Sequence, residues 1–343
     1  MPRVLRVSPT SPEPEVIAEA AAVLARGGLV AFPTETVYGL GARGLHESDV
    51  ALIFVAKGRP KGHPLILHVD GEPMARTLSA TWPDRASLLA RAFWPGPLTL
   101  VVARASHVPD VVSGGLPTVG VRAPQHPVAL ALIRAAGEPL AAPSANAHMH
   151  VSPTTAAHVV RSLGDRVDLV LDAGPCTHGI ESTVVDVVND PPRVLRAGAT
   201  SLEAIRTVVP EVVYDMITLT GDAARASPGL ASKHYAPRTR VVLADAGARF
   251  STSLSAAARG VARVGAVVWS AEAKRDTGAG SASPFTLASV AMLPADPDGY
   301  AHSIFAALHD ADEASLDVLV IERVPDEPGW WAVADRLRRA AEE

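Results

Sequence analysis

This 343-residue chain has few cysteines, few lysines and no long apolar run. Its one cysteine, Cys176, excludes an internal disulfide and any cysteine-rich zinc site. No uncharged apolar stretch reaches the ~18 residues that a membrane-spanning helix needs. The N-terminal segment lacks the apolar stretch of a signal peptide. These absences predict a cytoplasmic protein that does not bind membranes.

Motifs of several enzyme classes are also missing. The sequence contains no P-loop (G-x-x-x-x-G-K-[ST]) and no G-x-G-x-x-G, so we expect no glycine-rich backbone cradle for phosphate. Its 12 histidines form no H-E-x-x-H, and there is no G-x-S-x-G, so neither a protein-held metal nor a serine nucleophile is predicted. The net charge of −5 disfavours a protein that coats nucleic acids, although a local basic cleft is compatible with it.

Length and hydrophobic periodicity predict two domains. The chain is 48% apolar and 20% charged, which is typical of a globular protein. Up to residue 205, strands and helices mix without strict alternation, which indicates an α/β domain with a partly antiparallel sheet. Residues 206–237 carry few apolar patterns and are predicted to be a linker. Residues 238–343 alternate strand and helix, which predicts a smaller Rossmann-like parallel α/β domain.

The periodic segments define the predicted elements. In the first domain, helices are expected at 13–26, 48–57, 126–136 and 153–163. Strands are expected there at 29–32, 65–69, 98–102, 119–122, 140–142, 167–171, 183–187 and 194–196. In the second domain, we expect strands at 240–244, 265–269, 288–293 and 317–322, and helices at 251–259, 299–309 and 331–341.

Lysine is used sparingly, and its placement is informative. Only Lys57, Lys61, Lys233 and Lys274 occur among 31 basic residues, and the first two lie in one loop with Arg59. Cations at the end of a helix are stabilised there by ~0.3–1 kcal/mol, which is one interpretation. The other is phosphate binding by side chains, since charged hydrogen bonds to phosphate contribute ~1.5–3 kcal/mol each.

Alternating residues near position 120 predict a ligand-binding strand face. Thr118, Gly120 and Arg122 alternate with valines, so on a strand they share one face. A glycine between two polar residues leaves room for a ligand against the sheet. We therefore expect Arg122 to bind a carboxylate, and a solvated arginine at a strand end is the alternative.

Polar residues also follow the predicted strand 140–142. Ser144 and Asn146 stand at its carboxyl end, where α/β sheets bind ligands, or else in an ordinary turn. Ser152 precedes Pro153, the pattern of a helix N-cap, and a helix N-terminus also attracts anions.

Three further residues have two interpretations each. Glu35 and Glu181 are candidate bases or metal ligands, but their spacing is not diagnostic and surface carboxylates are common. His68 lies on an apolar strand, where a histidine is either a core residue or a ligand.

Taken in order, these motifs resemble the threonylcarbamoyl-AMP synthase family, in which a YrdC-type domain precedes a smaller C-terminal domain. The resemblance spans nearly the whole chain. It is carried by Phe32–Gly41, Lys57–Pro60, Pro64–Ile66, Trp94–Thr99, Ala142–Asn146, Glu181–Val184 and His234–Pro237. It implies a YrdC-type twisted mixed sheet with helices in 1–205, followed by the linker and the Rossmann-like domain.

The resemblance also implies an activity and a set of site residues. The enzyme would be a nucleotidyltransferase that converts ATP, with its Mg2+, bicarbonate and L-threonine into threonylcarbamoyl-AMP and pyrophosphate. The product would feed the threonylcarbamoyladenosine (t6A) modification of tRNA through a downstream transferase machinery, and weak binding of tRNA itself is compatible with this. Catalysis is expected to depend on Lys57 and Arg59. ATP contacts are expected from Lys57, Arg59, His63, Thr118, Ser144, Asn146, Ser152, Arg196 and His234. L-threonine contacts are expected from Thr36, His68, Arg122, Ala142 and Ser182.

Adenylyl transfer of this kind depends on positioning and charge neutralisation rather than on a protein nucleophile, which agrees with the missing triad. The alternatives are a related carbamoyl-adenylating or carbamoyl-transfer enzyme and an RNA-binding module of the YrdC type. Because His234 stands between the domains, we expect the C-terminal domain to act as a lid or in regulation.

Overall fold

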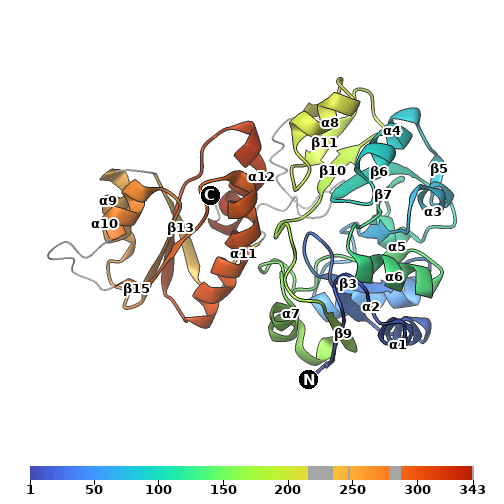
Figure 1. Cartoon of the computed structure of the whole chain (residues 1–343), viewed down its shortest axis with the longest axis horizontal. Helices are drawn as coiled ribbons and strands as arrows, with labels where there is room; N and C mark the ends of the chain where they lie inside the picture. The colour runs from blue at the N-terminus through green and yellow to red at the C-terminus, as the bar shows by residue number, and fades with distance from the viewer. Residues whose placement is uncertain (215–234, 246–247, 278–286, 342–343) are drawn as a thin grey trace. The chain divides into compact units, whose positions relative to one another are not determined.

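The computed structural model describes residues 1–214, 235–245, 248–277 and 287–341 (Figure 1). The chain folds into two compact units. The first contains Met1–His148 and Ser152–Leu230, and the second contains Met149–Val151 and Ala231–Glu343. Residues 215–234 of the predicted linker, including His234, lie outside the described residues.

The first unit contains a 12-stranded sheet that mixes parallel and antiparallel pairs. Its strands are β1 (Arg3–Arg6), β2 (Val30–Phe32), β3 (Gly39–Arg43), β4 (Ile66–His68), β5 (Ser79–Thr81), β6 (Leu98–Arg104), β7 (Thr118–Arg122), β8 (Leu140–Ala141), β9 (Leu169–Asp172), β10 (Thr183–Asp186), β11 (Arg193–Arg196) and β12 (Val213–Tyr214). The order is β1-β9-β2-β3-β8-β4-β7-β6-β10-β11-β12, and β5 pairs with β6. Strands β4 and β7 are parallel, whereas β6 and β7 are antiparallel. The predicted mixed sheet is therefore confirmed.

Helices of the first unit begin and end where local chemistry allows. Helix α1 (Pro14–Ala25) has a proline in its first turn, where a missing N–H costs little, and packs with α6 (Pro127–Ala136) against β2 and β9. Helix α2 (Glu47–Lys57) ends at Gly58, whose φ of 62° is a conformation that glycine adopts readily. The remaining helices are α3 (Glu72–Thr77), α4 (Asp84–Phe93), α5 (Asp110–Ser113), α7 (Ala156–Leu163), η1 (Gly164–Arg166) and α8 (Leu202–Val208).

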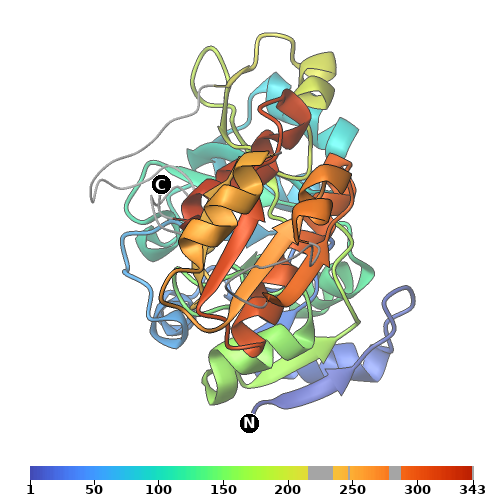
Figure 2. The ribbon, with the colours of Figure 1, turned by 90° about the vertical axis from the view of Figure 1, so that its left-hand side faces the viewer.

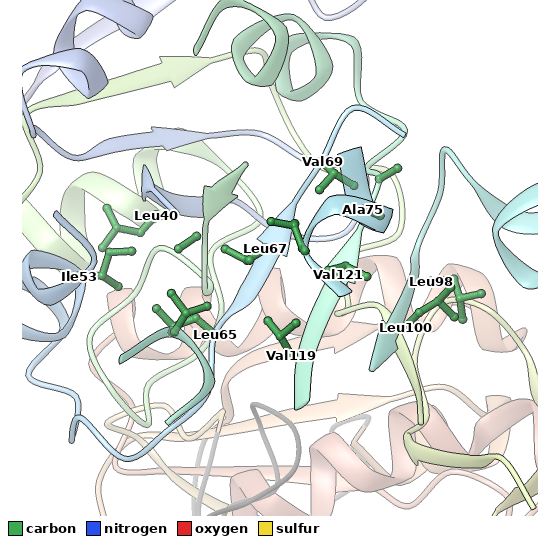
Figure 3. Close-up of a cluster of buried hydrophobic side chains, with 14 of the residues drawn as sticks. Leu40, Ile53, Leu65, Leu67, Val69, Ala75, Leu98, Leu100, Val119 and Val121 are labelled. Atoms are coloured by element: carbon green, nitrogen blue, oxygen red, sulfur yellow. The ribbon is translucent and has the colours of Figure 1, made fainter. Parts of the chain in front are cut away.

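One face of the central strands forms the main hydrophobic core (Figure 3). Leu65 and Leu67 of the β4 segment lie beside Val119 and Val121 of β7, and Leu100 of β6 continues the layer. Burial of each such side chain contributes ~1.5–3 kcal/mol. Because side chains alternate along a strand, the intervening residues of these strands point to the opposite face. That second face carries the candidate site.

The second unit contains a parallel four-stranded sheet in the order β13-β16-β14-β15. Its strands are β13 (Arg240–Ala244), β14 (Val264–Val268), β15 (Leu287–Met292) and β16 (Val318–Glu322). Helices α9 (Ala248–Ala257) and α10 (Ala271–Thr277) lie on one side of the sheet, and α11 (Pro297–Glu313) and α12 (Trp331–Ala341) on the other (Figure 1). A short helix, η2 (Pro328–Trp330), precedes α12. In Figure 2, α9 and α10 lie in front of the strands. The predicted Rossmann-like arrangement is confirmed.

Some local predictions differ from the structure. Ser152 is not a helix N-cap: α7 begins at Ala156, and Thr155 caps it by accepting a hydrogen bond from the His158 N–H. The expected linker residues 206–214 instead complete α8 and form β12, which pairs with β11. Strand β3 was missed because its two glycines interrupt the apolar pattern. Within the described part of the chain, no helix is long and apolar enough to cross a membrane.

Candidate active site

A row of residues crosses the sheet on the face opposite the core. His68 at the end of β4 pairs with Arg122 at the end of β7. Continuing the β6–β7 register by one residue places Thr99 beside Arg122. Thr99 pairs with Val184 of β10, which pairs with Arg196 at the end of β11. Neighbouring residues in one row project to the same face, so His68, Arg122, Thr99 and Arg196 share one face, with Val184 between the last two.

Strand β7 extends this surface in the perpendicular direction. Thr118, Gly120 and Arg122 lie on the same face, and the ends of this set are about 13 Å apart. Ile66 pairs with Gly120, and its carbonyl accepts a hydrogen bond of 3.0 Å from the N–H of Ala142. The predicted contacts Thr118, Arg122 and Ala142 therefore line one continuous stretch of the sheet.

Arg122 is held by a buried carboxylate. Its Nη2 lies 2.7 Å from Oε1 of Glu35, and its Nε donates to the carbonyl of Gly96 at 3.3 Å. Both charged residues are almost fully buried. Burial opposes ionisation of Glu35, but the adjacent positive charge and hydrogen bonding hold its pKa below the usual range. The structure thus shows Arg122 in a buried ion pair rather than as a solvated arginine.

His68 is a neutral imidazole in this environment. Burial, reinforced by the positive charge of Arg122 and only partly offset by Glu35, lowers its pKa to about 3. Its ring meets Phe32 edge-on at 6.1 Å between centroids. A neutral histidine offers one donor and one acceptor, which suits a hydroxyl group.

Ser182 and Arg196 form the other end of the row. The Ser182 hydroxyl lies 2.8 Å from that of Thr99, and Nη2 of Arg196 donates to it at 3.2 Å. Arg196 also donates from Nε to the Ser182 carbonyl at 3.1 Å. Glu181, the preceding residue, accepts a 2.6 Å bond from the hydroxyl of Ser152. Segment 181–183 is therefore fixed by side chains from two distant parts of the sequence.

Lys57 holds the loop that follows β8. Its ammonium donates to the carbonyl oxygens of Ser144 and Asn146. The pKa of Lys57 lies well below its usual value because the group is buried and because Arg59 and Arg166 add positive charge. An ammonium has three donors, so these two bonds leave one for a ligand. An anion is the ligand that this environment favours.

The remaining predicted residues lie around these groups. Arg59 donates from Nη2 to the carbonyl of Pro64 at 3.1 Å and is buried. The ring of His63 packs edge-on against that of His148, with 5.4 Å between the ring centroids. The hydroxyl of Thr36 lies 2.8 Å from that of Thr34. His234, the remaining predicted ATP contact, lies outside the described residues.

Sequence reasoning left the roles of two participants undecided. Glu35 and Glu181 had no diagnostic spacing, and the structure assigns them contacts to Arg122 and Ser152. The signal for Glu35 was its place between two threonines inside the segment Phe32–Gly41. In the part of the chain that the structure describes, no three histidine, cysteine or acidic side chains are grouped to hold a metal ion.

Comparison with known proteins identifies the family. A family model described as "Telomere recombination" matches residues 22–198, and one described as "Threonylcarbamoyl-AMP synthase, C-terminal domain" matches residues 200–342. A threonylcarbamoyl-AMP synthase of Pyrococcus abyssi is 40% identical over 94% of this chain and 93% of its own length. The chain belongs to the threonylcarbamoyl-AMP synthase family.

Other members of the threonylcarbamoyl-AMP synthase family agree with this assignment. A Bacillus subtilis threonylcarbamoyl-AMP synthase is 38% identical over 95% of this chain and 92% of its own. A crystal structure of Pyrococcus abyssi Sua5 complexed with L-threonine superimposes with a TM-score of 0.89, at 36% identity, over 98% of this chain and 97% of the other. The assignment of individual residues to L-threonine or ATP stays a prediction for this chain.

Proposed function

We propose that this protein is an L-threonylcarbamoyladenylate synthase, which converts L-threonine, bicarbonate and ATP into threonylcarbamoyl-AMP and pyrophosphate. The observation that carries the proposal is the sheet face that gathers His68, Arg122, Arg196 and Thr118. Its length of about 13 Å along β7 suits an amino acid joined to a nucleotide. Family membership and the threonine complex of the Pyrococcus abyssi protein support the same activity.

Positioning and charge account for the chemistry. Arg122 offers a planar guanidinium to the threonine carboxylate, and neutral His68 is suited to its hydroxyl. Lys57 and Arg59 would neutralise phosphate charge as the carbamate attacks the α-phosphate. The three cationic groups are already fixed by backbone carbonyls or by Glu35, so little reorganisation is needed when the substrates bind.

Magnesium would arrive on ATP and neutralise part of its phosphate charge. The described residues suit this arrangement, because cationic side chains rather than a group of carboxylates lie near the loop at Ser144. Magnesium commonly keeps water and phosphate oxygens as most of its ligands. In this proposal the product passes to a tRNA-modifying transferase in the cytoplasm.

Pyrophosphate release tests the function directly. We expect release only when ATP, bicarbonate and L-threonine are all present, and release that ignores threonine would refute the proposal. Arg122→Ala should raise the KM for L-threonine more than the KM for ATP, since it removes the partner of the threonine carboxylate. Arg85→Ala is a matched control, because this arginine pairs with Asp190 beyond the far end of β10.

A further inference from the structure

We propose that Glu35 is a further catalytic residue: its carboxylate binds the ammonium group of the amino-acid substrate and accepts a proton from it. This inference rests on the proposed function and assigns a role to a group that the predicted threonine contacts leave out. It concerns the ion pair between Glu35 and Arg122, which closes the polar face at the end of β7.

The first argument is the environment of Glu35. Its exposure is 3%, and the hydrogen bonds that reach its carboxylate come from Arg122 and from the backbone N–H groups of Glu35 and Gln125. Among the described residues none of these contacts has good hydrogen-bond geometry. The 2.7 Å contact with Nη2 of Arg122 supplies charge, but it is poorly aligned as a hydrogen bond. A buried carboxylate normally has several donors, because unmet hydrogen bonds on a charged group are costly. A ligand that brings N–H donors satisfies this requirement.

The second argument is that the backbone of Glu35 is fixed. Its carbonyl accepts hydrogen bonds from the Thr177 hydroxyl at 3.2 Å and from the His178 N–H at 2.8 Å. On its other side, the Thr34 hydroxyl accepts from the N–H groups of Thr36 and Val37. A side chain on so constrained a turn is held in place for a ligand.

The third argument is charge matching. An α-amino acid carries a carboxylate and an ammonium on one carbon, so both can reach an arginine and a glutamate that lie 2.7 Å apart. The substrate carboxylate binds Arg122 and the substrate ammonium binds Glu35. The ion pair between Glu35 and Arg122 is thereby replaced by two ion pairs with the substrate. An acid without the amino group would take Arg122 and leave Glu35 buried and uncompensated, which is strongly unfavourable. The pair therefore selects zwitterions.

The proton balance follows from this placement. The ammonium gives one proton to Glu35, leaving a neutral amine with a free electron pair. The amine nitrogen forms a bond to the carbon of bicarbonate, and the C–OH bond breaks. The departing hydroxide takes a second proton from nitrogen and leaves as water. The products are the carbamate, water and protonated Glu35, which then releases its proton to solvent.

The residues around Glu35 allow its proton affinity to rise when the substrate binds. The positive charge of Arg122 keeps Glu35 ionised, and the pKa of Glu35 lies below the usual value. Once the substrate carboxylate neutralises Arg122, burial is the dominant influence and raises proton affinity. The other titratable groups facing Glu35 are His68, His126 and Cys176. Burial lowers the pKa of both histidines and raises that of the thiol, so at neutral pH these three groups add little charge.

A comparison of two ligands tests the binding role. Calorimetry with the full-length wild type should give about 10–150-fold tighter binding of L-threonine than of 3-hydroxybutanoate, which lacks the amino group. Equal affinity for both would overturn the proposal, whatever the variants do. Glu35→Gln should reduce this preference to a few-fold, and an unchanged preference in the variant would also overturn it. If wild type binds no threonine at all, the proposed function itself fails, which is a distinct result.

The catalytic role has a separate readout. At saturating threonine, turnover of Glu35→Gln should fall at least ten-fold at pH 7.5 and recover toward the wild-type rate as pH rises and free amine forms. Wild-type turnover in the variant at pH 7.5 would refute the base assignment. The control is Asp49→Asn on helix α2, which breaks an ion pair of equal length, 2.7 Å to the partly exposed Arg43. Its ligand preference and pH profile should match those of the wild type.

Discussion

Acidification should destabilise the first unit through His68. The pKa of this histidine is about 3 in the folded protein against 6.5 for an unperturbed group, because burial and Arg122 disfavour the charged form. Between these two values the unfolded chain binds a proton that the folded protein does not bind. Lowering the pH through this window therefore favours unfolding.

The magnitude follows from the size of the window. Each pH unit below 6.5 removes about 1.4 kcal/mol, so the loss between pH 7.5 and pH 5 is about 2 kcal/mol. This is a substantial share of a typical domain stability of ~5–15 kcal/mol. His68→Gln cannot be protonated, so its free energy of unfolding should not include this loss.

Native-state hydrogen exchange followed by mass spectrometry suits the measurement, because it reports on peptides from β4 and β7 alone. The difference in unfolding free energy between the wild type and His68→Gln should change by about 2 kcal/mol between pH 7.5 and pH 5. The exposed His107 is the control, and His107→Gln should keep the pH dependence of the wild type. The reasoning would be refuted if the unfolding free energies of all three proteins changed equally with pH. An NMR titration of the His68 ring near pH 6.5 would also refute it.

Two other substitutions give clear expectations. Lys57→Met removes a cation and its hydrogen bonds to the Ser144 and Asn146 carbonyls. ATP affinity measured by calorimetry should therefore fall about 10–150-fold, while threonine affinity changes little. An unchanged ATP affinity would contradict the phosphate-binding role of Lys57. Gly198→Ala should lower the melting temperature by several degrees, because a Cβ there overlaps the backbone of residues 181–183, and Gly62→Ala, with open space at its Cβ, should not. Equal melting temperatures for the two alanine variants would contradict this expectation, because they would show that the backbone of 181–183 can move away from the added Cβ at little cost.

Local patterns in the sequence predicted much of the fold. The helix that ends at Gly58, the alternation of Thr118, Gly120 and Arg122, and the regular strand–helix repeat after residue 238 all appear as expected. These features depend on neighbours within a few residues, which is the range over which side-chain periodicity and glycine conformation act. The Ser152 N-cap failed because the same Ser-Pro pattern is satisfied by a bond to Glu181 in a distant segment.

The sequence by itself determined the family resemblance, the order of the elements and the face of β7 that carries polar residues. Only the tertiary structure decided that Arg122 pairs with Glu35, that Lys57 holds Ser144 and Asn146, and that Arg196 holds Ser182. The physical reason is sequence separation. Contacts between residues 87 positions apart, such as Lys57 and Ser144, depend on strand order and register across the whole sheet. No local pattern specifies that register, so the charges that meet on this face were fixed by folding.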